Sequence, residues 1–437
     1  MAATLAAASL LVVTTGCAAG DGGGTGPLGD TTDTKLVITG AQAPWSPAYE
    51  KVVAAYRDAT GVDVELRPFP NDEVKTQQLN DAQSGTHTFD VYLVNEVDVA
   101  QFNDDGLLLP FTDVDPDYAL DPEMFTYNNL PYWDADARTF SEDGALTTAP
   151  LLGNLQIYVY RTDVFDQLGL DVPTTWEDAV DVAAQVNQAG TVPYGYISRY
   201  QGVPGSPQVT FDFMGVLQGV GGQVFADPGT DWTPVVDSPE AIRAAEIFRD
   251  LASYGPAETN TIGQAEAIAA MQAGDAASLS VVAAAAAGFE DEANSNVAGK
   301  VGFAPLPGGV PATGTWNLGI PADLPEERRQ PALDFIDWVT SAEGMRVFAE
   351  AGGIPTRSDA FDAPGISDTA KGYLDAVAES AGNAEGPLRL TFIGPFLEVT
   401  EPIISGIAAG TIEPAAGMTQ MQEQLTQVVA DAGLPTK

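Results

Sequence analysis

The sequence predicts an α/β fold, and three observations support this prediction. Residues 35–39 and 62–66 are short apolar runs typical of strands, and apolar residues recur at helical spacing between them. A strand, a helix and a strand within about thirty residues form a βαβ unit, which implies a parallel sheet. Hydrophobic residues make up 45% of the 437 residues, as in an ordinary folded protein. At roughly 150 residues per domain, the chain holds about two to three domains' worth of core.

The first helix is predicted to begin at Ser46 and to end near Thr60. Pro47 suits the first turn of a helix, and Gly61 is a typical stop. Apolar residues recur on one face of this helix: Tyr49, Val52, Val53 and Tyr56. Trp45 lies in the loop between the first strand and this helix, which makes it a candidate site residue.

The next strand is predicted at residues 89–94, after a helix at residues 73–83. Asn95 and Glu96 follow that strand directly. Open α/β sheets bind ligands at the carboxyl ends of their strands. Both side chains are therefore candidates for hydrogen bonds to a ligand.

The middle of the chain alternates between apolar and polar residues at positions 154–160, as expected of a strand with one buried face. Thr174 or Thr175 can then cap a helix whose first turn contains Glu177 and Asp178. Further helices are predicted at residues 238–254, 331–351, 403–409 and 415–432.

The chain is strongly acidic, with 61 acidic and 18 basic residues and a formal net charge of -43. Nucleic acid and anionic membrane surfaces require cationic patches, so the charge argues against both as partners. Self-repulsion of this size is screened by salt, with a Debye length of about 3 Å at 1 M. The acidity indicates either a saline setting or simple solubility of an exported protein.

The chain has one cysteine, Cys17, and one histidine, His87. This excludes an intrachain disulfide and a zinc site built from cysteine and histidine. Catalysis by serine or cysteine with a histidine base would have to use His87, which lies in a predicted loop, and no G-x-S-x-G motif is present. Residues 113–117 have the opening spacing of a calcium loop, but Tyr118 stands where that loop needs glycine. We predict no metal site and no cofactor.

The N-terminus resembles a secretory signal. Residues 2–13 are apolar and too few to span a bilayer, which takes about 20 residues. Gly16 and Cys17 resemble a lipobox, in which the cysteine is acylated and becomes the mature N-terminus. We therefore predict a signal peptide at residues 1–16 and a flexible, lipid-anchored tether at residues 17–34, which are rich in Gly, Asp and Thr.

Residues 149–179 carry P-L-L-G-N-L-Q-I-Y-V-Y-R-T-D-V-F, then G-L, then P-T-T-W. This passage resembles the middle of bacterial extracellular sugar-binding proteins of ABC importers, known as solute-binding protein family 1. Other segments are similar to that family in the same order: residues 100–109, 210–222, 265–279, 300–307, 313–320, 354–357 and 394–398.

The resemblance implies a two-lobed, periplasmic-binding-protein-like fold with discontinuous lobes, a hinge and a ligand cleft between the lobes. We place the first lobe at residues 35–149 plus 308–352 and the second at residues 150–307 plus 353–437. A ligand that contacts both lobes favours the closed state. The implied role is the substrate-binding component of an importer, which delivers a sugar or polyol to the permease subunits. It implies a monomer at the outer face of the membrane, without catalysis.

The resemblance also suggests site residues. In relatives a Gly-Trp pair presents an aromatic face to a sugar; here the pair is Gly314 and Trp316, with one intervening residue. A sugar-binding site is expected to place a flat aromatic ring beside hydrogen-bonding groups. Arg357 either reaches the ligand or fastens the hinge. The candidate ligand-binding residues are Trp45, Asn95, Glu96, Asn154, Asp212, Trp316, Asn317 and Arg357.

Two other functions remain open from the sequence. A secreted glycoside hydrolase needs two carboxylates about 5–10 Å apart, which 61 acidic residues easily allow. A binding protein for a cationic solute, such as a polyamine or a peptide, would tolerate the acidity. It predicts more carboxylates and fewer stacking aromatics in the cleft.

Overall fold

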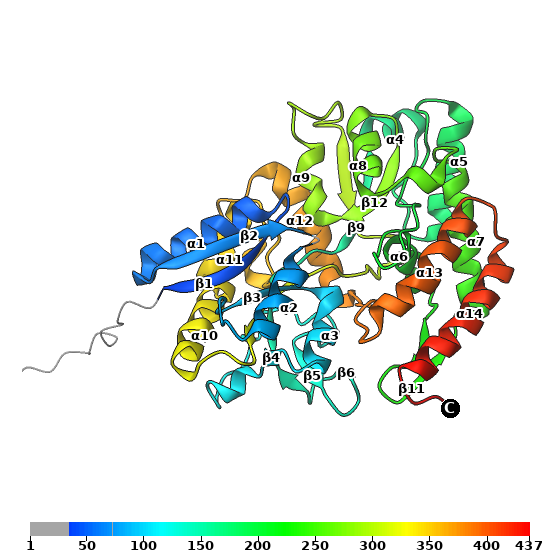
Figure 1. Ribbon diagram of the computed structural model, residues 1–437. Helices are drawn as coiled ribbons and strands as arrows, with labels where there is room; N and C mark the ends of the chain where they lie inside the picture. The colour runs from blue at the N-terminus through cyan, green and yellow to red at the C-terminus, as the bar shows by residue number, and fades with distance from the viewer. Residues whose placement is uncertain (1–34, 72) are drawn as a thin grey trace, which may run out of the picture. The chain divides into compact units, whose positions relative to one another are not determined.

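The computed structural model describes residues 35–71 and 73–437 (Figure 1). The predicted signal peptide, Cys17 and the tether lie outside the described residues. The described chain has mixed α/β structure, as predicted. Its strands form separate sheets, around which we define a first and a second lobe below.

The first lobe begins with the predicted βαβ unit. Strands β1 (Leu36–Gln42) and β2 (Val64–Pro70) pair in parallel, and α1 (Ser46–Thr60) connects them. Helix α1 ends at Gly61, whose φ of 74° is the left-handed conformation that glycine adopts at little cost. The prediction of parallel strands is correct for this unit, whereas the strands of the larger sheets in both lobes are antiparallel.

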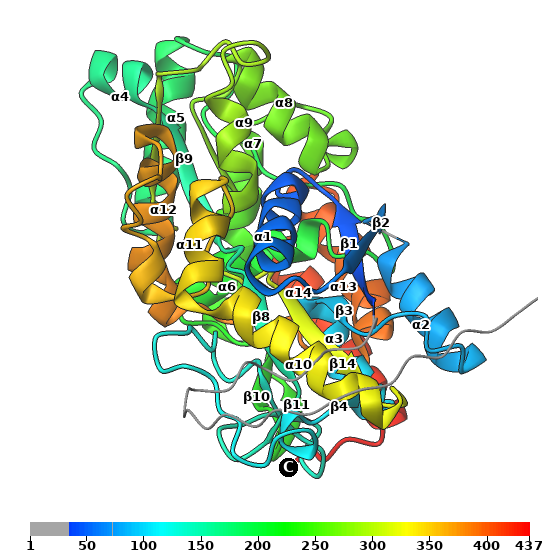
Figure 2. The ribbon, with the colours of Figure 1, turned by 90° about the vertical axis from the view of Figure 1, so that its left-hand side faces the viewer.

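The main sheet of the first lobe is built from distant parts of the chain. Strand β14 (Trp316–Pro321) lies between β3 (Tyr92–Asn95) and β8 (Thr148–Leu152), and its end pairs with β4 (Leu108–Leu109). A parallel bridge between Ile38 and Val91 connects β1 to this sheet. Besides α1, the helices of the lobe are α2 (Val74–Ser84), α3 (Glu96–Asp104), α10 (Glu326–Thr340) and α11 (Ala342–Glu350), and Figure 2 shows α10 and α11 beside α1.

A small antiparallel sheet extends the first lobe. It consists of β5 (Tyr132–Asp134), β6 (Thr139–Phe140) and β7 (Ala145–Leu146), with β5 in the middle. A single 3₁₀ turn, Phe111–Asp113, precedes it in the chain.

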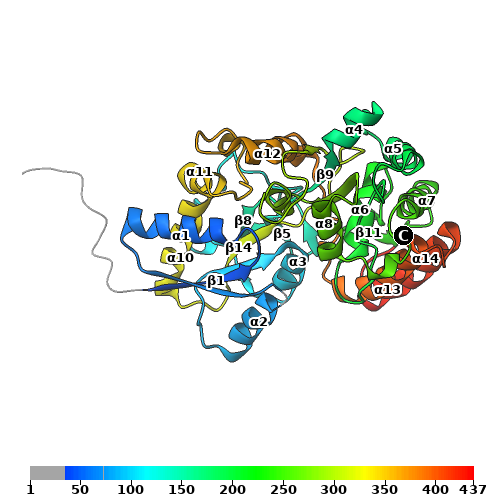
Figure 3. The ribbon, with the colours of Figure 1, turned by 90° about the horizontal axis from the view of Figure 1, so that it is seen from above.

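The second lobe surrounds a sheet in which β9 (Gln156–Arg161) lies between β12 (Ser278–Val282) and β13 (Val301–Ala304). A hairpin of β10 (Phe225–Asp227) and β11 (Asp231–Pro234) lies apart from it. Helices α7, α13 and α14 pack together on this lobe (Figure 3). Its helices are α4 (Thr162–Leu168), α5 (Trp176–Ala189), α6 (Val209–Gly219), α7 (Pro239–Ser253), α8 (Gln264–Ala273), α9 (Ala286–Phe289), α12 (Asp368–Ser380), α13 (Ile393–Ala408) and α14 (Pro414–Asp431). No helix among the described residues is both long and apolar enough to cross a membrane.

The predicted helix boundaries are partly confirmed. The Thr175 hydroxyl accepts a hydrogen bond from the Asp178 N–H at 3.1 Å, as a helix cap should. The single helix predicted at residues 331–351 is wrong, because α10 starts earlier and contains Pro331. It ends at Ser341, whose hydroxyl caps the separate helix α11 by accepting the Gly344 N–H at 3.2 Å.

The lobes are joined by chain segments that hydrogen-bond to one another. The Gly153 N–H donates to the Ile354 carbonyl at 3.0 Å, and the Gly314 N–H donates to the Asn154 carbonyl at 2.8 Å. A Cβ on Gly153 would lie 2.5 Å from the Tyr127 hydroxyl, so the chains can approach this closely only at a glycine. Strand β8 runs across the predicted lobe boundary at residues 149 and 150.

Candidate functional site: a cavity between the lobes

A cavity of about 550 Å³ lies where the two lobes meet. Asn128, Thr139 and Phe140 form its wall on the first lobe. The second lobe contributes the end of α6 and the β10–β11 hairpin, and residues 385–390 close a third side. Beside the cavity the lobes touch, because Arg138 of the first lobe donates to the Ala432 carbonyl at 3.1 Å.

Three consecutive residues centred on Asn128, which lines the cavity, adopt the left-handed conformation. Tyr127, Asn128 and Asn129 have φ values of 46°, 56° and 62°. Asparagine tolerates this conformation, but tyrosine rarely adopts it, so the surrounding contacts must hold the loop in place. The Asn128 carbonyl accepts a hydrogen bond from Arg389 at 3.0 Å, and its amide donates to Glu385 at 2.5 Å. The loop is thus fixed against the third side of the cavity.

A buried ion pair joins Glu96 to Arg389, with 2.6 Å between Oε1 and Nε. The two residues are 1% and 7% exposed. The Glu96 carboxylate also accepts hydrogen bonds from the Thr315 N–H at 2.8 Å, from its hydroxyl at 2.7 Å and from the Thr313 hydroxyl. It lies in the first turn of α3, where the helix dipole favours a negative charge. Burial, and then this charge, raise the pKa of Tyr127, so that its phenol stays protonated.

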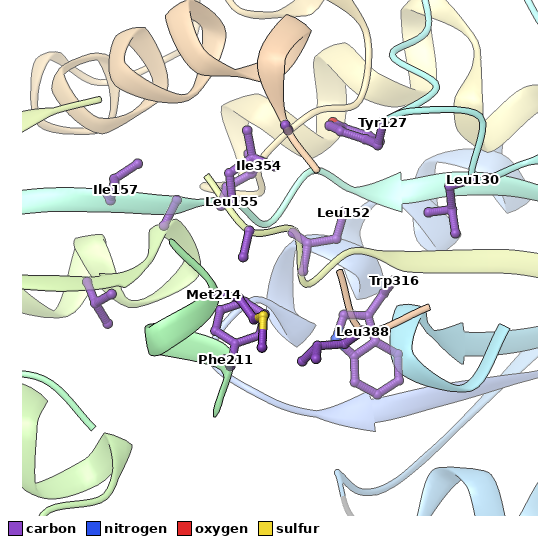
Figure 4. Close-up of a cluster of buried hydrophobic side chains, with 14 of the residues drawn as sticks. Tyr127, Leu130, Leu152, Leu155, Ile157, Phe211, Met214, Trp316, Ile354 and Leu388 are labelled. Atoms are coloured by element: carbon purple, nitrogen blue, oxygen red, sulfur yellow. The ribbon is translucent and has the colours of Figure 1, made fainter. Parts of the chain in front are cut away.

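The side chains of Trp45 and Trp316 lie next to each other. Their ring centroids are 5.7 Å apart, with 50° between the ring planes. Both rings are buried in this structure. Figure 4 shows Trp316 beside Leu388, with Phe211 and Met214 of α6 next to them, so this apolar cluster spans the junction of the lobes.

The three candidate asparagines lie in different elements, and each side chain hydrogen-bonds within the protein. Asn95 caps α3, where its side chain accepts the Val97 N–H at 3.2 Å. Asn154 lies in the segment that joins the lobes, and its side chain accepts the Ala284 N–H at 3.0 Å. Asn317 is fully buried within β14, where its amide donates to the Thr315 hydroxyl at 3.2 Å.

Asp212 and Arg357 are engaged in ion pairs. The buried Asp212 carboxylate pairs with Arg199 and also accepts hydrogen bonds from the Ser198 hydroxyl at 2.5 Å and the Gln156 amide at 3.0 Å. Arg357 pairs with Asp121 and Asp359, each at 2.9 Å. These contacts favour the second of the two roles considered for Arg357, which is to fasten the crossing segment.

None of the eight candidates is among the residues that line the cavity. Glu96 reaches it only through Arg389, which does line it. Sequence reasoning missed Arg389, Phe140, Gln218 and Trp232, and the scarcity of basic residues was the one signal that could have singled out Arg389. Among the described residues, no group of three or more acidic, histidine or cysteine side chains is arranged to hold a metal.

Two lobes joined by several chain crossings, with a cavity between them lined from both sides, define a two-lobed solute-binding protein. The chain belongs to the family of bacterial extracellular solute-binding proteins, whose model matches residues 42–346. This confirms the predicted family and its extracytoplasmic setting, and the two-lobed α/β fold.

Three known proteins illustrate the similarity. The mannitol-binding protein of Pseudomonas aeruginosa is 27% identical over 274 residues, which cover 61% of this chain and 59% of that protein. A probable amino-acid ABC transporter periplasmic-binding protein of Sinorhizobium fredii is 23% identical, over 74% of this chain and 73% of that protein. An ABC transporter solute-binding protein of Agrobacterium radiobacter K84, solved with ribitol, superposes with a TM-score of 0.72 at 22% identity, over 90% of this chain and 98% of that one.

Proposed function

We propose that this chain is the substrate-binding component of an ABC importer, which captures a sugar or polyol between its lobes. It delivers the ligand to the permease subunits and carries out no catalysis. In this proposal the protein is a monomer, anchored to the outer face of the membrane through Cys17. The lobes follow the boundaries predicted from the sequence, except that β8 extends the first lobe to Leu152.

The composition of the cavity walls carries this proposal. Amides, carboxylates and an aromatic ring line the same cavity: Asn128, Phe140, Gln218, Gln223, Asp227 and Glu385. Hydrogen-bonding groups beside a flat apolar ring suit the hydroxyl groups and C–H faces of a carbohydrate. The relatives named for mannitol and solved with ribitol support a neutral polyhydroxylated ligand.

Of the sequence candidates, we retain Trp45, Asn154 and Trp316 as residues that face a ligand when the lobes separate. All three lie where the lobes join. We assign Glu96 to positioning Arg389, because protein groups already surround its carboxylate. The remaining candidates act in the framework: Asn95, Asp212, Asn317 and Arg357.

An amino-acid ligand is the second candidate, because one relative carries that name. Such a ligand needs a cation for its carboxylate. Arg389 is the one basic side chain among the described residues that line the cavity, and it is already paired with Glu96. This pairing favours the neutral ligand.

Asp227 and Glu385 are the carboxylates that line the cavity, so they are the groups that a polyamine or a hydrolytic mechanism would use. Glu385 is hydrogen-bonded to the Asn128 amide. Hydrolysis of aryl-glycosides by the purified protein would support the enzyme, and stabilisation by polyamines alone would support the cation-binding role.

The test is a thermal-shift screen of residues 35–437 in low and high salt. The panel contains mannitol, ribitol, maltose, amino acids and polyamines. A ligand at 100 times its Kd stabilises the folded state by about 2.7 kcal/mol, which raises the melting temperature measurably. We expect a sugar or polyol to do so, and stabilisation by amino acids or polyamines alone would contradict the proposal.

A further inference from the structure

Two residues that line the cavity each have a buried polar side-chain atom without a hydrogen-bond partner among the described residues. They are Nε1 of Trp232 and Oε1 of Gln218, and both residues line the cavity. A buried polar group without a partner is destabilising, and most such groups in folded proteins are paired. Two such groups in residues that line one cavity point to groups that a bound molecule completes.

Trp232 cannot act as a stacking platform. Its side chain is 1% exposed, and its ring packs against Phe225 at 5.4 Å and Phe392 at 5.6 Å between centroids. The group left to interact is the indole N–H. A second buried indole in the same lobe, that of Trp176, donates to the Gly215 carbonyl at 3.1 Å, so an unpaired N–H is not general to this lobe.

Gln218 lies in the last turn of α6. Its backbone carbonyl accepts the Gly221 N–H at 2.9 Å and so helps to end the helix, whereas its side-chain oxygen remains free to accept a hydrogen bond. The indole is a donor only, and the amide oxygen is an acceptor. Hydroxyl groups both donate and accept, so a polyhydroxylated ligand satisfies both atoms.

We propose that Trp232 and Gln218 are hydroxyl-recognising residues that determine the specificity of the cavity. The Trp232 N–H donates to an oxygen of the ligand, and the Gln218 side-chain oxygen accepts from a ligand hydroxyl. This assignment rests on the proposed carbohydrate function. A site built to pair with a hydroxyl rejects analogues that lack it, because its buried groups are then left unpaired.

The test compares Trp232→Phe and Gln218→Met with two matched controls. Trp338→Phe makes the same replacement in α10, where Trp338 packs edge-on against Tyr56 at 5.5 Å, and Gln185→Met changes an exposed residue of α5. Mannitol, ribitol and maltose are titrated calorimetrically into each protein. We expect each cavity variant to lose about tenfold or more in affinity and the controls to stay within about twofold.

A second measurement separates recognition from packing. The protein is labelled with ¹⁵N at its indoles, and the Trp232 N–H resonance is assigned by its absence in Trp232→Phe. This resonance should shift when a probe that binds is added. The Trp338 resonance should stay in place. If a probe binds the wild type but leaves both this resonance and the affinities of the cavity variants unchanged, the inference is overturned and the carbohydrate function stands. If none of the three probes binds the wild type, both the inference and the proposed carbohydrate function are overturned.

Discussion

Replacing Arg389 with methionine tests the role that the structure gives to the Glu96–Arg389 pair. The substitution keeps much of the side-chain volume but leaves the Glu96 carboxylate, 1% exposed, without its cation. Removing one partner of a buried ion pair costs about 3–5 kcal/mol. Three donors from Thr313 and Thr315 still contact the carboxylate, so we expect the lower end of that range, ~3 kcal/mol.

The loss is measured as the free energy of unfolding in urea at constant salt. Arg346→Met is the matched control, because Arg346 pairs with Glu343 and Glu350 at the surface, where such pairs contribute about 0–1 kcal/mol. The double variant Glu96→Gln/Arg389→Met should recover part of the loss, since it leaves no unpaired buried charge. The reasoning is refuted if Arg389→Met and Arg346→Met lose the same stability.

Three further predictions concern the framework. Gly153→Ala should lose about 1–3 kcal/mol of unfolding free energy, because its Cβ would lie 2.5 Å from the Tyr127 hydroxyl and 2.8 Å from the Pro355 carbonyl. The pKa of Asp81 lies below its ordinary value: burial opposes ionisation, but hydrogen bonds, first among them that from the Thr88 N–H, outweigh it. The Asp81 carboxylate therefore stabilises the fold above its unfolded pKa, and the deficit of Asp81→Asn should shrink as the pH falls through the folded pKa. Finally, the urea midpoint should rise between about 0.1 and 1 M salt, because salt screens a net charge of -43.

Each of these predictions has its own check. Gly394→Ala is the control for the first, since a Cβ there meets no atom within 4 Å, and an equal loss at both glycines would contradict the steric account. A pH-independent deficit in Asp81→Asn would show that hydrogen-bond geometry rather than charge matters. A salt-independent midpoint would mean that surface self-repulsion contributes little to the stability.

The sequence predicted the parts of the fold that local patterns determine. The Ser46 start, the Gly61 stop and the Thr175 cap all depend on neighbours a few residues away. The break at Ser341 was missed because the apolar face continues across it, although Ser341 begins the new helix as a cap that accepts the Gly344 N–H. Strand order was also inaccessible, since β14 enters the sheet more than two hundred residues after β3.

The site was harder to predict because side chains far apart in sequence decide which polar groups are free. Glu96 was placed correctly at the end of a strand, but its partner Arg389 lies 293 residues later. Asp212 likewise lies in the first turn of α6, and its carboxylate is paired with Arg199. The resemblance to a family thus predicted the fold, but none of its eight candidate residues lines the cavity, and only the hydrogen bonds separate residues that hold the framework from those on the cavity wall.

Calorimetric titration of mannitol, ribitol and maltose into the wild type and Phe140→Ala tests the central claim most directly, because Phe140 is the half-buried ring that the first lobe contributes to the cavity. The account predicts one saturable site for at least one of these ligands and a loss of about tenfold or more in affinity in the variant. Absence of saturable binding to all three, or equal affinity in both proteins, would contradict the capture of a sugar or polyol in this cavity.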